Sequence, residues 1–138
     1  MAAKNSLHKT DIPKDGQFVA LSRLKNRADF ISARNGTRSH RRAFVMQLHQ
    51  RNTAEPNNDL RVGFTVTTKI GNAVIRNRIK RRFREAIKQI TIPEGACGHD
   101  LVLIARRIAA DLPFQQLVKD VEEALTEAVL LSQEKNNT

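Results

Sequence analysis

Eight Lys and Arg side chains gather between residues 69 and 88, where Glu85 is the one acidic residue. Residues 76–85 read RNRIKRRFRE, with Asn77 between two arginines. Guanidinium groups bind phosphate oxygens, and an amide that both donates and accepts suits a base edge or a 2′-hydroxyl. The alternative is a surface helix that extends long side chains into solvent, but such a helix would carry more acids at i+4. The segment therefore predicts a contact with nucleic acid.

The remaining charge follows the same pattern. A second basic run, Arg23 to Arg42, holds seven Lys and Arg residues and one acid, Asp29, whereas the balance reverses from Asp111 onward. The whole chain carries 24 Lys+Arg against 14 Asp+Glu, a formal net charge of +10. Charges kept only for solubility would be spread out, so two nearly acid-free runs favour a face built for a polyanion.

Catalysis by the chain itself is not supported. The four histidines show no metal-ligand spacing, and Cys97 with His99 lacks an orienting carboxylate. No pair of acids lies in the basic region to hold two metal ions. We predict no catalytic residue, no metal site and no protein-bound cofactor. The histidines are His8, His40, His49 and His99.

The first half of the chain predicts one helix and two strands. We expect a helix over 23–33, ended by Asn35-Gly36, and a strand over 43–48. A long hairpin connection over 50–59 leads to a strand over 60–67, whose apolar residues alternate with polar ones. One face of this sheet is predicted to be packed and the other polar and open.

The second half predicts a long amphipathic helix over 72–90, an apolar strand over 101–105 and a last helix over 113–131. On the helix over 72–90 the apolar residues fall within an arc of about 120°, and the cations lie on the opposite side. The order helix-strand-strand-helix-strand-helix predicts a single-domain two-layer α+β sandwich, in which a βαβ crossover carries the basic helix. The apolar arc consists of Ile75, Ile79, Phe83, Ala86, Ile87 and Ile90.

The 138 residues suffice for one domain. We expect a flexible N-terminal leader over 1–18, an RNA-binding domain over 19–132 and a disordered tail over 133–138. No apolar stretch approaches the length of about 20 residues that a membrane span requires. We expect a cytoplasmic protein. The six Phe, without Trp or Tyr, argue against an extended base-stacking platform.

The motif RNRIKRRFRE, preceded by RVGFTVTTKIGNAVI, resembles the RNR motif of the bacterial ribonuclease P protein family. The similarity extends from SRLKNRADF at residue 22 to DLVLIAR at residue 106. The resemblance implies the α+β sandwich and a subunit of a ribonucleoprotein endonuclease that removes the 5′ leader from precursor tRNA. It also implies that the catalytic RNA holds the Mg²⁺ ions, that no obligate protein partner is needed, and that the protein promotes substrate affinity and metal binding.

The resemblance further implies two RNA-binding surfaces. One surface contacts the catalytic RNA, and the other, a cleft between the first helix and the open sheet face, holds the single-stranded leader. The first is matched by Arg76, Asn77, Arg78, Lys80, Arg81 and Arg84, and the second by Arg23, Phe30, Phe44 and Lys69. Family members often have two further aromatic residues in the cleft, where this chain has Arg34 and Gln47. We therefore expect leader binding to rest more on charge than on stacking and to fall steeply with salt.

Two other classes of protein share some of these features. A ribosomal or assembly protein could carry a similar basic helix but would not need an open polar sheet face. A DNA-binding repressor would ordinarily need a helix-turn-helix pair and a dimer interface. Here strands flank the basic helix, which disfavours the repressor.

Overall fold

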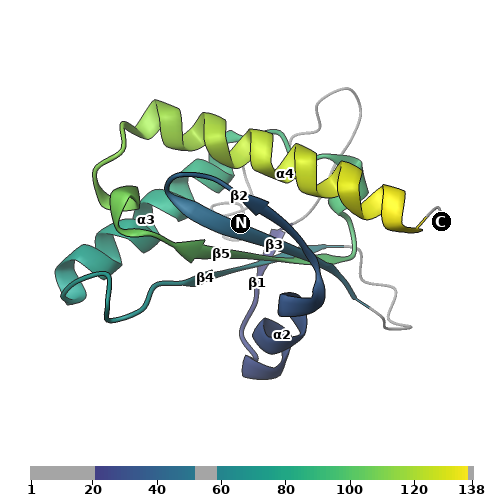
Figure 1. Ribbon diagram of the computed structural model, residues 1–138, viewed down its shortest axis with the longest axis horizontal. Coiled ribbons are helices and arrows are strands. Elements are labelled where there is room, and N and C mark those ends of the chain that lie inside the picture. The colour runs from purple at the N-terminus through teal and green to yellow at the C-terminus, as the bar shows by residue number, and fades with distance from the viewer. Residues whose placement is uncertain (1–20, 52–58, 137–138) are drawn as a thin grey trace, which may run out of the picture.

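Apolar residues from three chain segments build the centre of one sheet. β3 (Phe44–Gln50) and β4 (Leu60–Thr65) mix buried and more exposed positions, whereas β5 (His99–Ala105) is buried along nearly its whole length. A strand that is covered on both faces reads as a continuous apolar run. The computed structural model describes residues 21–51 and 59–136 and shows a five-stranded sheet with the order β1-β4-β5-β3-β2 (Figure 1).

β3 and β4 are not the predicted hairpin. β5 lies between them, antiparallel to β3 and parallel to β4. The apolar run of β5 is stabilised by neighbours on both edges, and this nonlocal pairing replaces the local one. β4, α3 (Ala73–Gln89) and β5 form the predicted βαβ crossover. The outer strands are β1 (Leu21–Arg23), parallel to β4, and β2 (Thr37–His40), antiparallel to β3.

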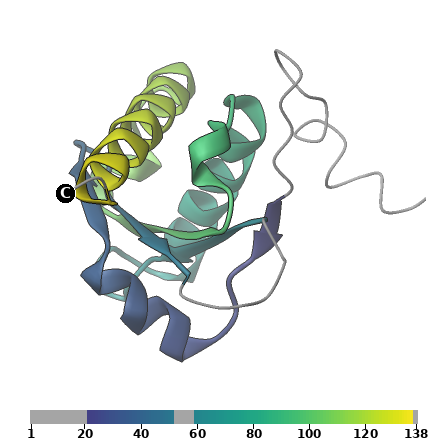
Figure 2. The ribbon, with the colours of Figure 1, turned by 90° about the vertical axis from the view of Figure 1, so that its right-hand side faces the viewer.

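Two helices cover one face of the sheet. α3 and α4 (Phe114–Asn136) lie on this face (Figure 2), and the larger hydrophobic core fills the space beneath them. Phe83 of α3 meets Phe44 edge to face, with ring centroids 6.0 Å apart, and lies 5.7 Å from the ring of Phe64. Burial of one such side chain contributes about 1.5–3 kcal/mol. The predicted two-layer α+β sandwich is confirmed.

A short helix lies on the opposite face (Figure 2). This is α2 (Arg27–Ser32), continued by the 3-10 turn η1 (Ala33–Asn35). Phe30 packs there against a second buried cluster of Leu24, Ala33 and Val102. Gly63 permits this approach, because a Cβ at that position would lie 2.5 Å from Cζ of Phe30. The sheet face predicted to be open is therefore covered in part.

The first helix begins later than predicted. Instead of a helix from residue 23, β1 pairs with β4, and the backbone N–H of Leu24 extends this pairing by donating to the carbonyl of Val62 at 3.0 Å. Gly36 follows the helical segment in extended backbone, with φ −84°, so it is not a left-handed stop. A Cβ on Gly36 would lie 2.2 Å from the carbonyl oxygen of Leu48, and this close approach explains the glycine.

Three further boundaries differ from the predictions. β2 has the polar sequence TRSH, in which Thr37 and Ser39 are buried, so an apolar pattern could not reveal it. β5 begins at His99, two residues before the predicted start. α4 continues to Asn136, so residues 133–136 are helical and do not belong to a disordered tail. The predicted leader over 1–18 lies outside the described residues, as do residues 52–58 and 137–138.

α3 follows its prediction closely. Asn72 caps the helix, with its Oδ1 accepting from the backbone N–H of Ile75 at 3.0 Å. Ile79, Phe83, Ala86 and Ile87 are buried, as the apolar arc requires. A short segment joins β5 to α4 through the 3-10 turn η3 (Arg107–Ala110), and η2 (Glu94–Ala96) precedes β5. Within the described residues, no helix is long and apolar enough to span a bilayer.

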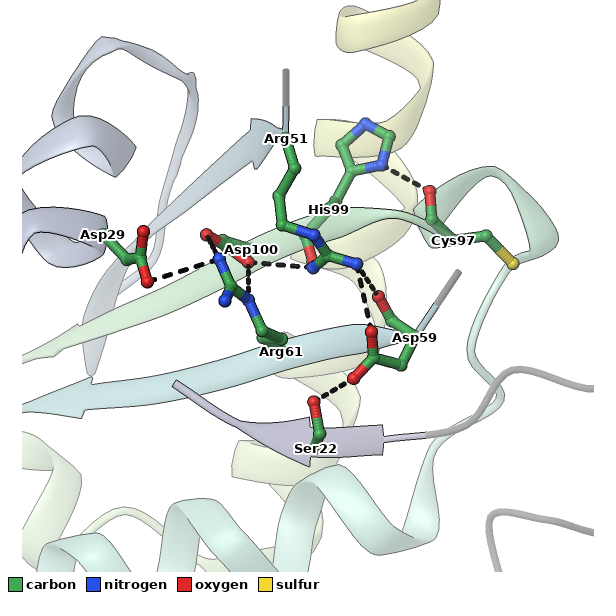
Figure 3. Close-up of polar contacts among 8 residues, drawn as sticks. All are labelled: Ser22, Asp29, Arg51, Asp59, Arg61, Cys97, His99 and Asp100. Carbon is green, nitrogen blue, oxygen red and sulfur yellow. Dashed lines mark hydrogen bonds and ion pairs between the residues drawn. The ribbon is translucent and has the colours of Figure 1, made fainter. Parts of the chain in front are cut away.

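A network of charged groups ties the β3, β4 and β5 strands together at one end of the sheet (Figure 3). Asp100 of β5 has a side chain only 2% exposed and accepts from two arginines. Arg61 binds it through both oxygens, at 2.7 and 2.8 Å, and Arg51 binds it at 3.0 Å. Arg51 also pairs with Asp59 at 3.0 Å. These charges are buried but paired, as burial requires.

His99, beside this network, gives stability a pH dependence. Burial lowers its pKa from the ordinary value of 6.5, and the charges of Arg51 and His49 lower it further, against the opposing effects of the Cys97 carbonyl, bonded to Nδ1 at 2.9 Å, and of Asp100. The unfolded chain therefore binds more protons between the lowered pKa and 6.5. We expect the free energy of unfolding to rise with pH across this window and then level off.

Denaturant unfolding at a series of pH values measures this slope. His99→Asn keeps an N–H donor for the Cys97 carbonyl but removes the titration, so its curve is expected to lose that component of the slope. Gln89→Asn, at an exposed position without a titratable group, is the control and should leave the slope unchanged. Identical slopes for the His99 variant and the unaltered protein would contradict this assignment.

Candidate nucleic-acid interface

The outward side of α3 is a continuous cationic surface. Opposite the buried stripe, Arg78, Arg81 and Arg84 are exposed, Asn77 is exposed between the first two turns, and Lys80 is half-buried. The helical period that buries Ile79 and Phe83 necessarily turns these side chains outward. The structure thus brings five of the six residues predicted to bind catalytic RNA onto one exposed helix surface.

The sixth residue, Arg76, folds back along the first turn. Its Nε donates to the carbonyl of Gly71 at 3.1 Å. Arg78 likewise donates to the carbonyl of Ala110 at 3.0 Å, and Arg107 of η3 donates to the carbonyl of Ile70 at 2.8 Å. A carbonyl uses one donor of each guanidinium and leaves its charge uncompensated. These arginines are therefore positioned while keeping most of their five donors for a ligand.

Few carboxylates neutralise this surface. Among the described residues, the one ion pair made by a cation of α3 joins Lys88 to Glu85 at 3.7 Å. Arg82 has a structural place instead, donating to the carbonyl of Leu112 and lying over the ring of Phe114 at 6.0 Å. Burial and the neighbouring charge of Arg78 lower the pKa of Arg82, against a weaker effect of Asp111. An unneutralised cationic helix of this kind suits a phosphate backbone.

The predicted leader surface is only partly available. Phe30, one of its residues, fills the space between α2 and the sheet at Gly63. Beside α2, one row of the sheet stays partly exposed, and it crosses four strands in register. The row consists of Thr65, Ile104, Val45 and His40. A single-stranded RNA bound next to Phe30 would contact the side chains of this row.

Three other predicted leader residues are exposed. Arg34 lies in η1, directly after α2, and Lys69 lies in the turn between β4 and α3. Arg23 is in register with Val62, whose side chain belongs to the core on the α3 side. Paired residues of neighbouring strands point to the same face, so Arg23 points away from α2. Arg34 follows Phe30 by four residues, about one helical turn, in the continuous segment of α2 and η1.

The assignment of two residues to the leader surface is wrong. Phe44 is fully buried beneath α3, where it contacts Phe83, and cannot line a surface. Gln47 is on the α2 face but is 2% exposed, in register with Val102 of the second cluster. Residues three apart on a strand point to opposite faces. The strand period alone therefore excludes one cleft that contains both side chains.

A basic pocket was not predicted as a site. A cavity of about 430 Å³ lies where β2 turns into β3 and β5 ends. Arg41 is occupied by Glu127 at 2.9 Å, whereas Arg42 is 4.0 Å from Asp120 and largely exposed. Arg106 makes no ion pair within the described residues. The feature of the sequence that could have indicated this pocket was the run of Lys and Arg residues that ends at Arg42. The lining residues are His40, Arg41, Arg42, Arg106 and Asp120.

Comparison with known families places these features in context. A family model described as Ribonuclease P matches residues 18–129. The ribonuclease P protein component of Brucella suis is 42% identical over 109 residues, covering 75% of this chain and 77% of that protein. The protein of the same name from Erythrobacter litoralis is 41% identical over 107 residues, covering 76% and 84%.

Solved structures show the same similarity. The RNase P protein of Staphylococcus aureus is 32% identical, with a TM-score of 0.62, over 77% of this chain and 94% of that one. The RNase P protein of Thermotoga maritima is 25% identical, also with a TM-score of 0.62, over 77% and 96%. Both alignments cover nearly the whole of the solved chains, so the likeness is one of complete domains.

Proposed function

This chain belongs to the ribonuclease P protein family, and from that premise we propose that α3 binds the catalytic RNA while the sheet face beside α2 binds the 5′ leader of precursor tRNA. As a ribonuclease P protein component, the chain is part of an endoribonuclease, and the family implies a role in tRNA 5′ processing. The family match decides against the ribosomal and repressor alternatives.

The observation that carries the proposal is the uncompensated charge of α3. Arginines held by carbonyl groups, with Asn77 exposed among them, offer phosphate donors and one group able to read a base edge or 2′-hydroxyl. The partner that we expect to cover the long cationic surface of α3 is the catalytic RNA of ribonuclease P. The basic pocket at Arg42 and Arg106 lies off this helix and would hold a further backbone phosphate.

We assign bond cleavage and Mg²⁺ binding to the RNA. An array of arginines repels a divalent cation but lowers the mutual repulsion of two RNA backbones. The protein would then raise affinity for the leader and the occupancy of metal sites on its RNA partner. We place this function in the cytoplasm, where precursor tRNA is matured in bacteria, and we propose no obligate protein partner.

Reconstitution tests the function. Catalytic RNA and the protein are combined with precursor tRNA at a Mg²⁺ concentration at which the RNA alone is nearly inactive. We expect 5′-leader removal only when both are present, and none with protein alone. Cleavage by the protein alone would overturn the assignment of the active site to RNA, and no stimulation would overturn the function.

Phe30→Ala should lower the preference for leader-bearing over mature tRNA. The ring lies beside the exposed row of the sheet, and loss of one stacked base costs about 1–3 kcal/mol. We expect the ratio of the two dissociation constants, measured with the reconstituted holoenzyme, to fall about tenfold. Ile31→Ala on the same helix is the control, because Ile31 is exposed. An equal loss for mature tRNA would contradict leader contact by Phe30.

A further inference from the structure

α2 is attached to the sheet by few contacts. None of its six residues is buried, and its apolar attachment consists of Phe30 on Gly63, followed by Ala33 of η1. A helix of this length has little stability of its own. Its orientation on the sheet must therefore depend on whatever else holds it there.

One ion pair supplies that contact. Oδ2 of Asp29, in the first turn of α2, lies 3.4 Å from Nη2 of Arg61 on β4. Figure 3 shows the Arg61 guanidinium between Asp29 and Asp100. Because Asp100 holds Arg61 through two hydrogen bonds and is itself buried, the guanidinium has a fixed position and orientation. Asp29 thus connects α2 to a guanidinium group that Asp100 already holds in place.

The charge of Asp29 is otherwise unfavourable for RNA binding. Asp29 is the one acid in the basic run from residue 23 to residue 42, and its side chain is 28% exposed. A carboxylate at a surface for a polyanion lowers affinity by repulsion. Its presence next to Phe30 requires a compensating role.

We propose that Asp29 is a positioning residue for leader binding: through its ion pair with Arg61 it holds α2 so that Phe30 and Arg34 keep their places beside the exposed row of the sheet. This inference rests on the proposed function, because it assigns the leader to that face. It concerns the geometry of the leader surface only and leaves the α3 contact to catalytic RNA unaffected.

The sign of one effect separates positioning from simple electrostatics. Asp29→Asn removes a negative charge, so repulsion alone predicts tighter binding of RNA. Positioning predicts the opposite for leader-bearing precursor. We expect its dissociation constant, measured with the reconstituted holoenzyme, to rise about three- to fivefold, as fits a partly exposed ion pair. Mature tRNA should bind as before. Glu123→Gln, on the exposed side of α4, is the matched charge control.

Two more variants distinguish positioning from a general effect on folding. Arg61→Lys keeps the charge but cannot bind Asp100 through a fork and reach Asp29 as well, so it should also weaken precursor binding selectively. In a Phe30→Ala background, Asp29→Asn should weaken precursor binding less than it does alone, because Arg34 is then the one proposed leader contact that it still positions. Thermal unfolding of each variant shows that the proteins are folded at the assay temperature.

Unchanged or tighter precursor binding by Asp29→Asn would overturn the inference, and so would equal weakening for mature tRNA or full additivity with Phe30→Ala. The unaltered protein in the same assay tests the proposed function separately. If it stimulates cleavage while Asp29→Asn behaves identically, only the positioning role fails. If the unaltered protein gives no stimulation, the proposed function fails first.

Discussion

Replacing Arg76 and Arg78 together with alanine is expected to weaken binding of the catalytic RNA about 100-fold, since one charge-assisted contact to phosphate is worth about tenfold. Both guanidinium groups are held by carbonyl oxygens, and neither makes an ion pair with a carboxylate among the described residues. The slope of log affinity against log salt should also become shallower, by about 0.7–0.9 for each lost phosphate contact.

Filter binding over a salt series measures both quantities. The matched control is Lys119→Ala with Lys135→Ala. This double variant also removes two positive charges, but from α4. Its effect should be several-fold at most, because only long-range attraction is lost. Equal weakening by the two double variants would show that net charge, and not the α3 surface, governs binding.

The second large effect is on stability. Asp100→Ala leaves two arginines without their shared carboxylate, and one of them, Arg51, has a side chain only 8% exposed. Removing one partner of a buried ion pair costs about 3–5 kcal/mol where the remaining charge is left unpaired. Here Arg51 keeps its pair with Asp59, Arg61 keeps its pair with Asp29, and Arg61 is a quarter exposed. We therefore expect the free energy of unfolding to fall by about 3 kcal/mol, the lower end of this range.

Urea unfolding with and without the substitution measures this cost. Glu123→Ala, at an exposed position of α4, should change the free energy of unfolding by at most about 0.5 kcal/mol. Asp100→Asn tests the charge alone, because it keeps the shape and some hydrogen bonds. A loss below about 1 kcal/mol for Asp100→Ala would show that water readily solvates the two arginines.

The basic helix was predictable because its signals are local. The apolar arc and the opposing cations both lie within one segment, and the structure confirms them; the cap at Asn72 was not predicted. β5 was predictable for the same reason, as a continuous apolar run. These elements follow from periodicity and capping, which do not depend on what lies elsewhere in the chain.

The pairing of strands was not predictable in this way. β5 separates β3 from β4, so the predicted hairpin is wrong although both strands exist. β2 was missed because its buried Thr37 and Ser39 are polar, and Ser39 is satisfied by Glu127 of α4 at 2.6 Å. Such contacts join residues far apart in sequence, so no local sequence pattern predicts them.

The leader surface was predicted with mixed results for a related reason. Alternation along a strand shows that two faces exist but not which face a helix will cover. Phe44 was placed on the leader surface and lies in the core, whereas Phe30 lies on the expected side of the sheet. The ion network at Asp100 and the pocket at Arg106 come from several strands and helices, and only the folded chain brings them together.

The two-surface account can be tested by mapping which RNA lies near each surface. In a Cys97→Ser background, single cysteines are introduced by Glu85→Cys on α3 and Ile31→Cys on α2, both at exposed positions that remove no cation. An iron chelate attached to each cysteine generates hydroxyl radicals within the assembled holoenzyme and substrate. The account predicts cuts in the catalytic RNA from position 85 and cuts in the 5′ leader from position 31. Cuts in the same RNA segment from both positions, or leader cuts from position 85 alone, would contradict it.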